Sequence, residues 1–141
     1  MRYLKRKIDL FLAEWKAAPN HKPLIVKGPR QVGKTESVQR FAQSSYENVI
    51  YINFVEEPKY KLITADGYKT DEIIKNISRL DPGKRFLPGK TLLFFDELQE
   101  FPDIATALKF FSIDGRFDVI CSGSMLGINY RKIESNSVGY K

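Results

Sequence analysis

Apolar residues recur along the chain at two spacings, and the alternation between them predicts an α/β fold. Over residues 3–18, Leu4, Ile8 and Trp15 fall on one face of a helix, and Pro19 ends the segment. Short apolar runs that are rich in β-branched and aromatic residues instead predict strands. These strands are expected at residues 24–26, 48–54, 91–95 and 117–121.

Helical stretches separate the predicted strands. They are expected at residues 34–43, at 72–80 and from Pro102 through Phe111. Asp71 is placed to cap the second helix and Pro102 to open the third, while residues 55–70 show no clear pattern. Continuous apolar strands that alternate with helices form a parallel sheet that is buried on both faces. Such a sheet binds its ligand at the carboxyl ends of its strands, so the candidate chemistry is sought there.

The first predicted strand leads into the pattern G-x-x-x-x-G-K-T, which predicts a phosphate-binding loop. Glycines let the backbone wrap closely enough for several N–H groups to point at one phosphate. Lys34 is expected to reach the β- and γ-phosphates, and the Thr35 hydroxyl is expected to bind Mg²⁺. A chance match in a turn is the alternative, but a strand precedes the loop and a helix follows it. The predicted binding residues are Gly28, Pro29, Arg30, Gln31, Val32, Gly33, Lys34, Thr35 and Glu36.

The third predicted strand ends in two adjacent acidic residues, Asp96 and Glu97. Carboxylates are costly in a core but useful where a strand emerges beside a nucleotide. We expect Asp96 to hold Mg²⁺, directly or through water, and Glu97 to polarise the attacking water. The alternative is a strand that ends in an ordinary charged turn.

Polar residues also end two other strands. Ser122 and Ser124 follow the fourth strand, and either serine is placed to contact a γ-phosphate or to orient water. We rank Ser124 ahead of Ser122. Asn53 ends the second strand and is placed to hold Glu97 in an inactive rotamer until a nucleotide or a partner arrives. Ordinary turn residues would look the same, so both interpretations stay open.

Composition excludes several other classes of protein. The chain has 141 residues, 43% of them hydrophobic and 28% charged, which is typical of one ordinary globular domain. Its single cysteine, Cys121, permits no intrachain disulfide. No run approaches the roughly 20 apolar residues of a membrane span, and Asp9 and Glu14 interrupt a start that otherwise mimics a signal peptide. We therefore expect a soluble, cytoplasmic protein. The only histidine, His21, lies in a polar turn and supports neither a metal site nor histidine-dependent catalysis.

The formal net charge of +6 is concentrated near the N-terminus, where residues 1–47 carry ten Lys or Arg and four acidic side chains. A basic surface of this kind could face nucleic acid or another polyanion. A solvated helix face beside a phosphate pocket is the alternative. We favour the second interpretation because no nucleic-acid-binding motif accompanies the charge.

Three strings in the chain carry a resemblance to a known family. They are Gly-Pro-Arg-Gln-Val-Gly-Lys-Thr, Phe-Phe-Asp-Glu-Leu-Gln-Glu and Ser-Gly-Ser. Together they resemble the AAA superfamily of P-loop ATPases, in the archaeal and bacterial branch that usually continues into a C-terminal domain of uncertain function. The likeness runs from about Leu4 to Tyr140. It implies a three-layer P-loop NTPase sandwich with strand order 5-1-4-3-2, and ATP with Mg²⁺ as its nucleotide.

The resemblance also implies roles for individual residues. Residues 28–35 match the Walker A loop, and Asp96 and Glu97 match Walker B. Ser124 or Ser122 matches the sensor at the end of the fourth strand. Asn53 lies where such ATPases often carry a polar switch residue.

The chain departs from these relatives at its C-terminal end. Relatives continue into a fifth strand, a helical lid and a further domain, whereas this chain ends at Lys141, about where the fifth strand is expected to begin. We therefore expect a P-loop core over residues 1–128, a tail over residues 129–141, no fifth strand and no lid. The P-loop strand would then be a sheet edge, and nucleotide binding and turnover would be weak. In many ring ATPases the region around Arg131 supplies an arginine finger to the neighbouring subunit, but we favour an exposed tail arginine.

The sequence thus favours an ATP-binding domain of a AAA-type ATPase, which in the intact protein hydrolyses ATP with Glu97. Two alternatives from other classes stay open. One is a nucleotide-gated interaction module that switches a protein partner or a homo-oligomer, and the other is a basic nucleic-acid-binding domain with little turnover. A GTPase is disfavoured because the chain has no Asn-Lys-x-Asp motif for reading the base.

Overall fold

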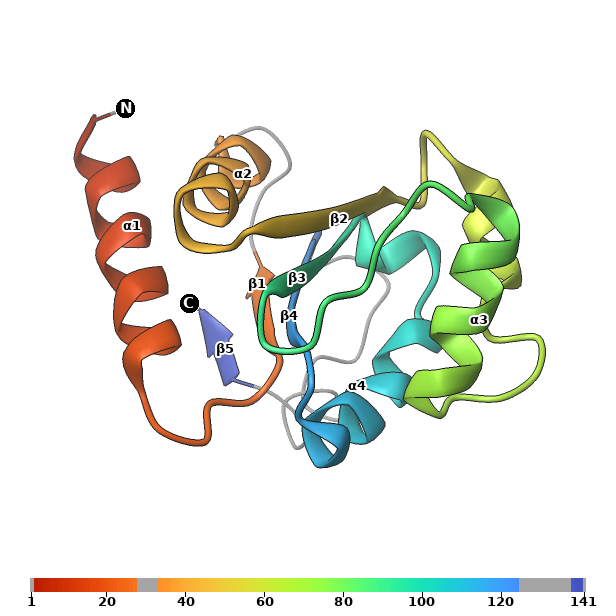
Figure 1. Ribbon diagram of the computed structural model, residues 1–141. Helices are drawn as coiled ribbons and strands as arrows, with labels where there is room; N and C mark the ends of the chain where they lie inside the picture. Colours follow the sequence, from red (N-terminus) through yellow and green to blue (C-terminus); the bar gives the residue numbers. More distant parts are fainter. Residues whose placement is uncertain (1, 28–32, 125–137, 141) are drawn as a thin grey trace.

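A parallel five-stranded sheet forms the centre of the computed structural model, in the order β2-β3-β4-β1-β5 (Figure 1). The structure describes residues 2–27, 33–124 and 138–140, with the backbone alone at 2–6 and 138–140. All strand pairs run parallel, as the continuous apolar strands predict. The strands are β1 (Leu24–Lys27), β2 (Asn48–Asn53), β3 (Thr91–Asp96), β4 (Asp118–Gly123) and β5 (Val138–Tyr140).

Helices cover both faces of this sheet. Figure 1 shows α1 and α2 on one side of the strands and α3 and α4 on the other. These helices are α1 (Arg2–Ala17), α2 (Lys34–Ser45), α3 (Thr70–Leu80) and α4 (Asp103–Asp114). Two 3₁₀ helices, η1 (Pro58–Leu62) and η2 (Leu98–Glu100), follow β2 and β3. Each helix and strand that the hydrophobic spacing predicts is present, and the unassigned segment 55–70 holds η1.

The alternation of side chains along each strand divides the core into two layers. On β3, for example, Leu92 and Phe94 pack with α1 and α2, whereas Leu93 and Phe95 pack with α3 and α4. The core layer under α1 includes Leu12 and Trp15. The Trp15 indole N–H donates a hydrogen bond to the Lys22 carbonyl, which connects α1 to the segment before β1. This division is the three-layer sandwich expected from the sequence. Among the described residues, no helix has the length and apolar character needed to cross a membrane.

The fifth strand corrects one expectation. Val138–Tyr140 pairs in parallel with β1, with Leu24 opposite Val138 and Val26 opposite Tyr140, so the strand is present. The strand that leads into the P-loop is therefore flanked on both sides and is not a sheet edge. Three residues with a glycine at their centre are too short a run to predict a strand from spacing alone.

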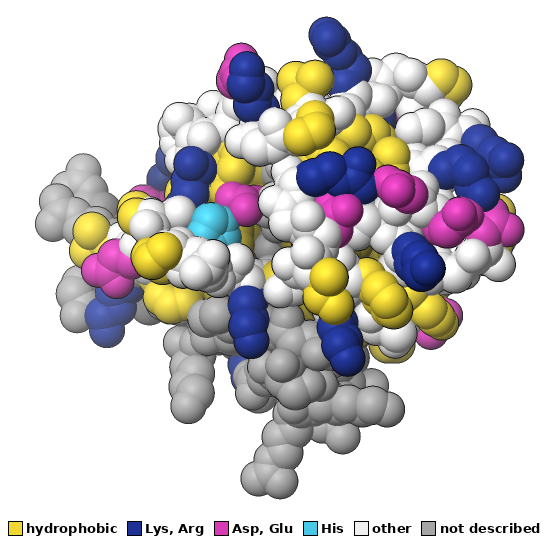
Figure 2. Space-filling model, turned by 60° about the horizontal axis from the view of Figure 1, so that its bottom comes forward, with side chains coloured by type: hydrophobic (Ala, Val, Ile, Leu, Met, Phe, Trp, Pro, Cys, Tyr) yellow, Lys and Arg dark blue, Asp and Glu magenta, His cyan; other side chains and the backbone are white. Residues whose placement is uncertain are grey.

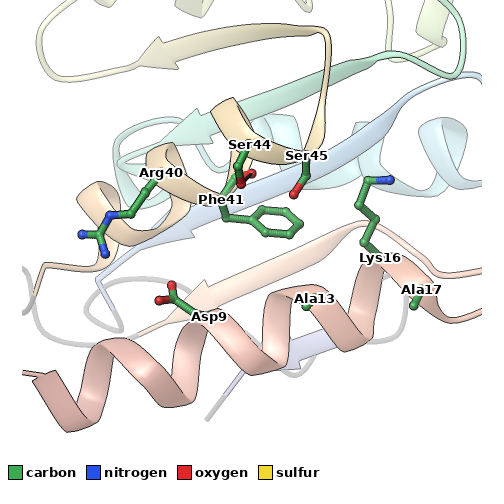
Figure 3. Close-up of a pocket in the computed structure, with 8 residues that line it drawn as sticks. All are labelled: Asp9, Ala13, Lys16, Ala17, Arg40, Phe41, Ser44 and Ser45. Atoms are coloured by element: carbon green, nitrogen blue, oxygen red, sulfur yellow. Dashed lines mark hydrogen bonds between the residues drawn. The ribbon is translucent and has the colours of Figure 1, made fainter.

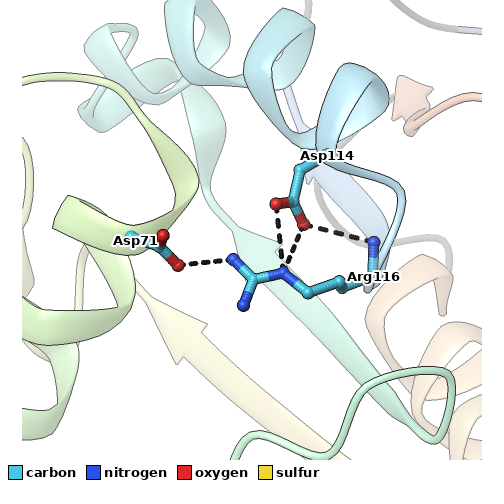
Figure 4. Close-up of polar contacts among 3 residues, drawn as sticks. All are labelled: Asp71, Asp114 and Arg116. Atoms are coloured by element: carbon cyan, nitrogen blue, oxygen red, sulfur yellow. Dashed lines mark hydrogen bonds and ion pairs between the residues drawn. The ribbon is translucent and has the colours of Figure 1, made fainter.

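The start of α3 corrects a second expectation. The N-cap residue is Lys69, and Asp71 lies inside the first turn of the helix. There its negative charge interacts favourably with the positive N-terminal end of the helix dipole. The Asp71 carboxylate accepts a hydrogen bond from Arg116 at 2.5 Å, and Arg116 Nε also contacts both oxygens of Asp114 at 3.0 and 2.9 Å (Figure 4). Asp71 therefore links α3 to the turn after α4 instead of capping its own helix.

Candidate functional site

The carboxyl ends of β3 and β4 and the start of α2 meet at one edge of the sheet. Phe95 lies opposite Cys121 in the β3–β4 register, so the residues that follow them, Asp96 and Ser122, are neighbours. The first residues of α2, Lys34 and Thr35, reach the same place from the chain segment after β1. The structure thus brings together the predicted lysine, threonine and acidic residue from two separate stretches of sequence, residues 34–35 and Asp96.

The Asp96 carboxylate is the centre of this site. It is 3% exposed and accepts four hydrogen bonds. Oδ2 accepts from the Thr35 hydroxyl at 2.8 Å and from the Tyr51 hydroxyl at 2.7 Å. Oδ1 accepts from the Ser122 hydroxyl at 2.5 Å and from the Glu97 backbone N–H at 2.8 Å. These contacts fix the carboxylate and hold three hydroxyl groups around it.

Thr35 and Asp96 together fit one magnesium ion. Mg²⁺ prefers oxygen ligands at roughly 2.1 Å, so two adjacent ligands of an octahedron lie about 3 Å apart. The 2.8 Å distance from Thr35 Oγ1 to Asp96 Oδ2 is close to that spacing. Within the described part of the chain, His, Cys, Asp and Glu form no cluster of three or more that could hold a metal. The site therefore offers Mg²⁺ one hydroxyl and one carboxylate, as in sites where nucleotide phosphates supply further ligands.

Lys34 lies beside these oxygens at the N-terminal end of α2. Its side chain is 6% exposed, and Nζ donates a hydrogen bond to the Gly123 carbonyl at 2.9 Å. Gly33 precedes it with φ 70°, a left-handed conformation that glycine adopts without strain, and its carbonyl accepts the first helical bond from Ser37. The turn therefore aims the lysine at the end of β4. Gly28, Pro29, Arg30, Gln31 and Val32, which belong to the predicted loop, lie outside the described residues, as does Arg131.

Glu97 has an unusual backbone for its residue type. Its φ of 61° and ψ of 48° lie in the left-handed region, which costs a non-glycine residue about 1–3 kcal/mol and is concentrated at functional sites. The side chain turns back on the following 3₁₀ helix, where Oε1 accepts a hydrogen bond from Gln99 Nε2 at 2.5 Å. Glu97 is thus a partly exposed residue that directly follows Asp96 in the chain.

The remaining predicted residues lie near this centre in different ways. Ser122 reaches Asp96 with its hydroxyl, whereas Ser124 is held through its backbone N–H, which donates to Gln99 Oε1 at 2.9 Å. Asn53 donates to the Tyr51 hydroxyl at 3.2 Å, and its Oδ1 accepts the backbone N–H groups of Val55 and Glu56. Asn53 therefore stabilises the turn after β2 and supports the tyrosine; its role as a switch on Glu97 stays a prediction.

Glu36 lies on the outer face of α2, where Arg40 donates to it at 3.2 Å. Two residues that touch the site were not predicted from the sequence, Tyr51 and Gln99. Tyr51 could not be predicted because no sequence motif in its own strand distinguishes it from the other apolar residues there. The available sequence signal for Gln99 was its position, two residues after the acidic Glu97.

Two half-buried tyrosines, Tyr46 and Tyr51, predict how stability depends on pH. Burial raises the pKa of Tyr51 above its ordinary value near 10, and the hydrogen bond to Asp96 adds to the effect. Burial likewise raises the pKa of Tyr46, whose hydroxyl donates to Asp118 at 2.5 Å. Both tyrosines have a higher pKa in the folded state than in the unfolded state. Their contribution to the free energy of unfolding is therefore fully present below about pH 10 and is lost as the pH rises above it.

We expect the denaturant midpoint of the wild-type chain to fall from about pH 9 to pH 11 more steeply than that of a Tyr46→Phe/Tyr51→Phe double variant. Chemical denaturation followed by fluorescence measures both slopes. Tyr68→Phe, which leaves the two carboxylate contacts in place, is the control and should keep the wild-type slope. Equal slopes in the wild type and the double variant would contradict the assignment.

Two hollows in the described surface lie away from this edge. The first, of about 500 Å³, opens between α1 and α2, where Asp9 and Ala13 face Arg40 and Phe41 (Figure 3). The second, of about 490 Å³, is lined in part by His21 and Asp118. The His21 ring, cyan in Figure 2, lies 2.8 Å from Asp118 Oδ1 and 2.9 Å from the Ala18 carbonyl. Neither of these two hollows contains the Asp96 cluster.

Comparisons with known proteins agree with this architecture. The chain is similar in structure to PCH-2 of C. elegans, with a TM-score of 0.58, 14% identity, and coverage of 96% of this chain and 42% of that one. It is also similar to Drosophila ORC bound to AT-rich DNA and Cdc6, with a TM-score of 0.61, 12% identity, and coverage of 99% and 55%. RuvB T158V of Thermotoga maritima matches with a TM-score of 0.57, 16% identity, and coverage of 99% and 44%.

The chain thus spans about half the length of these solved structures. At these identities the likeness shows the fold, which is that of the P-loop NTPases and confirms the expected fold class. No curated protein matches the sequence. The family model described as "AAA domain" matches residues 20–141, which include the whole Asp96 cluster. The chain therefore belongs to the AAA-domain family.

Proposed function

We propose that this chain is the ATP-binding domain of a AAA-type ATPase, which binds Mg·ATP and, in the intact protein, hydrolyses it to ADP and phosphate. The observation that carries the proposal is the contact of Thr35 with the buried Asp96 carboxylate, beside the Lys34 ammonium. Membership of the AAA-domain family supports it. Phosphate-binding lysine, magnesium-binding hydroxyl and carboxylate are the components that a P-loop ATPase requires.

Each residue has a defined task in this proposal. Lys34 donates to phosphate oxygens, and the N-terminal end of α2 favours their negative charge. Thr35 and Asp96 hold Mg²⁺, which when bound neutralises charge on the phosphates. Glu97 accepts a proton from the attacking water, which is the step of general base catalysis. Ser122 and Tyr51 fix the rotamer of Asp96 by donating to its two oxygens.

A titration with a fluorescent ATP analogue, with and without Mg²⁺, tests the proposal. We expect saturable binding that Mg²⁺ strengthens and that Lys34→Ala weakens about tenfold to a hundredfold, since the variant loses a charge-assisted hydrogen bond. Lys109→Ala, a change of the same kind on the exposed surface of α4, is the matched control and should bind as the wild type does. Circular dichroism checks that each variant is folded. A folded wild-type chain that binds no analogue, or equal affinity in Lys34→Ala, would refute the proposal.

Partners are proposed for the intact protein only. A homo-oligomer or a protein partner is one possibility. A nucleic acid is the less supported one: the basic residues among positions 1–47 would suit a polyanion and the similar ORC structure is a complex with DNA, but no nucleic-acid-binding motif accompanies the charge.

A further inference from the structure

One peptide unit at the end of β4 joins the phosphate-binding lysine to the acidic pair. Its carbonyl oxygen, on Gly123, accepts a hydrogen bond from Lys34 Nζ at 2.9 Å. Its N–H, on Ser124, donates to Gln99 Oε1 at 2.9 Å. No peptide bond in the described residues is cis, and the C=O and N–H groups of a trans unit point in opposite directions. This peptide therefore lies between the ammonium on one side and the Gln99 side chain on the other.

Gln99 continues the connection to Glu97. Its amide uses both ends, because Oε1 accepts from the Ser124 N–H and Nε2 donates to Glu97 Oε1 at 2.5 Å. A backbone N–H requires an acceptor and a carboxylate requires a donor, so only one orientation of the amide satisfies both neighbours. The orientation of the Gln99 side chain is thus determined by its two contacts.

The end of β4 is shaped to receive this side chain. A Cβ atom added at Gly123 would lie 2.8 Å from Gln99 Oε1 and 3.1 Å from the backbone nitrogen of Leu98. The absence of a side chain at Gly123 therefore lets η2 approach the strand closely enough for the hydrogen bond to form. Leu98 is fully buried and fixes the same turn in the core.

We propose that Gln99 is a positioning residue that couples nucleotide at Lys34 to the orientation of the Glu97 carboxylate. The proposal rests on the proposed function and adds a form of regulation to the same site. Phosphate oxygens accept stronger hydrogen bonds from an ammonium than a peptide carbonyl does, so a bound nucleotide reorients the three N–H donors of Lys34 and weakens the bond to the Gly123 oxygen. The peptide then shifts its contact with Gln99, and the Gln99 amide changes its hydrogen bond to Glu97. Glu97 is thereby redirected toward the attacking water when a nucleotide is present.

Nuclear magnetic resonance of the full chain tests the coupling directly. The side-chain amide of Gln99 gives its own ¹⁵N–¹H signals, and we expect Glu97→Ala to shift them in the free protein. We expect titration with Mg²⁺ and a non-hydrolysable ATP analogue to move the Gln99 signals and the Ser124 backbone amide with the same midpoint as the Lys34 and Thr35 amides. In Lys34→Ala the Gln99 signals should not respond.

The outcomes separate the two proposals. Shifts at Lys34 and Thr35 without a response at Gln99 would support nucleotide binding and overturn the coupling. An unchanged Gln99 signal in Glu97→Ala would also overturn the coupling. A folded chain with no shift at any of these positions would refute the proposed function itself, and the coupling with it.

Two variants at position 99 separate coupling from packing. Gln99→Glu keeps an acceptor for the Ser124 N–H but removes the donor to Glu97, and Gln99→Met keeps the volume without either hydrogen bond. We expect both to slow single-turnover hydrolysis about a hundredfold while the affinity for the analogue stays within about twofold of wild type. Gln43→Met, on the exposed face of α2, is the matched control. Wild-type rates in both variants at position 99 would overturn the coupling.

Discussion

Replacing Glu97 by glutamine is expected to slow ATP hydrolysis about a hundredfold to a thousandfold and to leave Mg·ATP bound. Glutamine has the same size and can take the same left-handed backbone, but its amide cannot accept the proton of the attacking water. Gln99 can still donate to the carbonyl oxygen of the new side chain, as it does to Glu97 Oε1. The substitution therefore removes a chemical function and keeps the geometry.

Single-turnover hydrolysis with the protein in excess over ATP measures this effect even where turnover is slow. The fluorescent analogue titration, run beside it, should give wild-type affinity. Glu100→Gln is the matched control, because Glu100 ends the same 3₁₀ helix with its side chain exposed. Hydrolysis at the wild-type rate in Glu97→Gln would remove Glu97 from the role of general base.

Replacing Asp96 by asparagine is expected to abolish the strengthening of ATP binding by Mg²⁺ and to slow hydrolysis about a hundredfold or more. Asparagine offers one oxygen where the carboxylate offers two, and it carries no charge for the cation. The Thr35 and Tyr51 hydroxyls, which now donate to Oδ2, can rotate and accept from the new NH₂ group. We therefore expect the free energy of unfolding to change by only about 1 kcal/mol.

The affinity ratio with and without Mg²⁺ is the quantity to measure, together with a denaturation curve. Asp103→Asn, in the exposed first turn of α4, is the control and should keep the wild-type ratio. An Asp96→Asn variant whose affinity still rises with Mg²⁺ would place the cation elsewhere. A large loss of stability without a change in the ratio would give Asp96 a purely structural role.

Much of the fold could be predicted because hydrophobic spacing is a local property of the sequence. The strand around Phe94, for example, is apolar at four consecutive positions, residues 92–95, and is recognisable without its neighbours. Strand order is not a local property of the sequence, and the expected order 5-1-4-3-2 was inferred from the resemblance to AAA-superfamily ATPases. The short strand Val138–Tyr140 was missed because its formation depends on pairing with β1 and not on its own residues.

The same distinction applies to the candidate site. Lys34, Thr35 and Asp96 could be predicted because a phosphate-binding loop imposes a fixed spacing on its residues. Tyr51 is 45 positions from Asp96, and their contact exists only because β2 lies next to β3. Gln99 and Ser124 are 25 positions apart, and their hydrogen bond forms because β3, which precedes Gln99, lies next to β4, which precedes Ser124. Contacts between strands need the topology, and no spacing within one segment encodes them.

The left-handed backbone at Glu97 has a consequence for how the protein responds to selection. Glycine, and to a lesser degree asparagine, adopts that conformation at lower cost than glutamate does. The residue that suits the turn best is therefore not the residue that the proposed chemistry needs. Directed evolution for heat resistance alone would favour Glu97→Gly or Glu97→Asn and would remove the proposed general base as it gained stability. Under the proposed function, thermostable variants would therefore have to be selected under a simultaneous demand for ATP turnover.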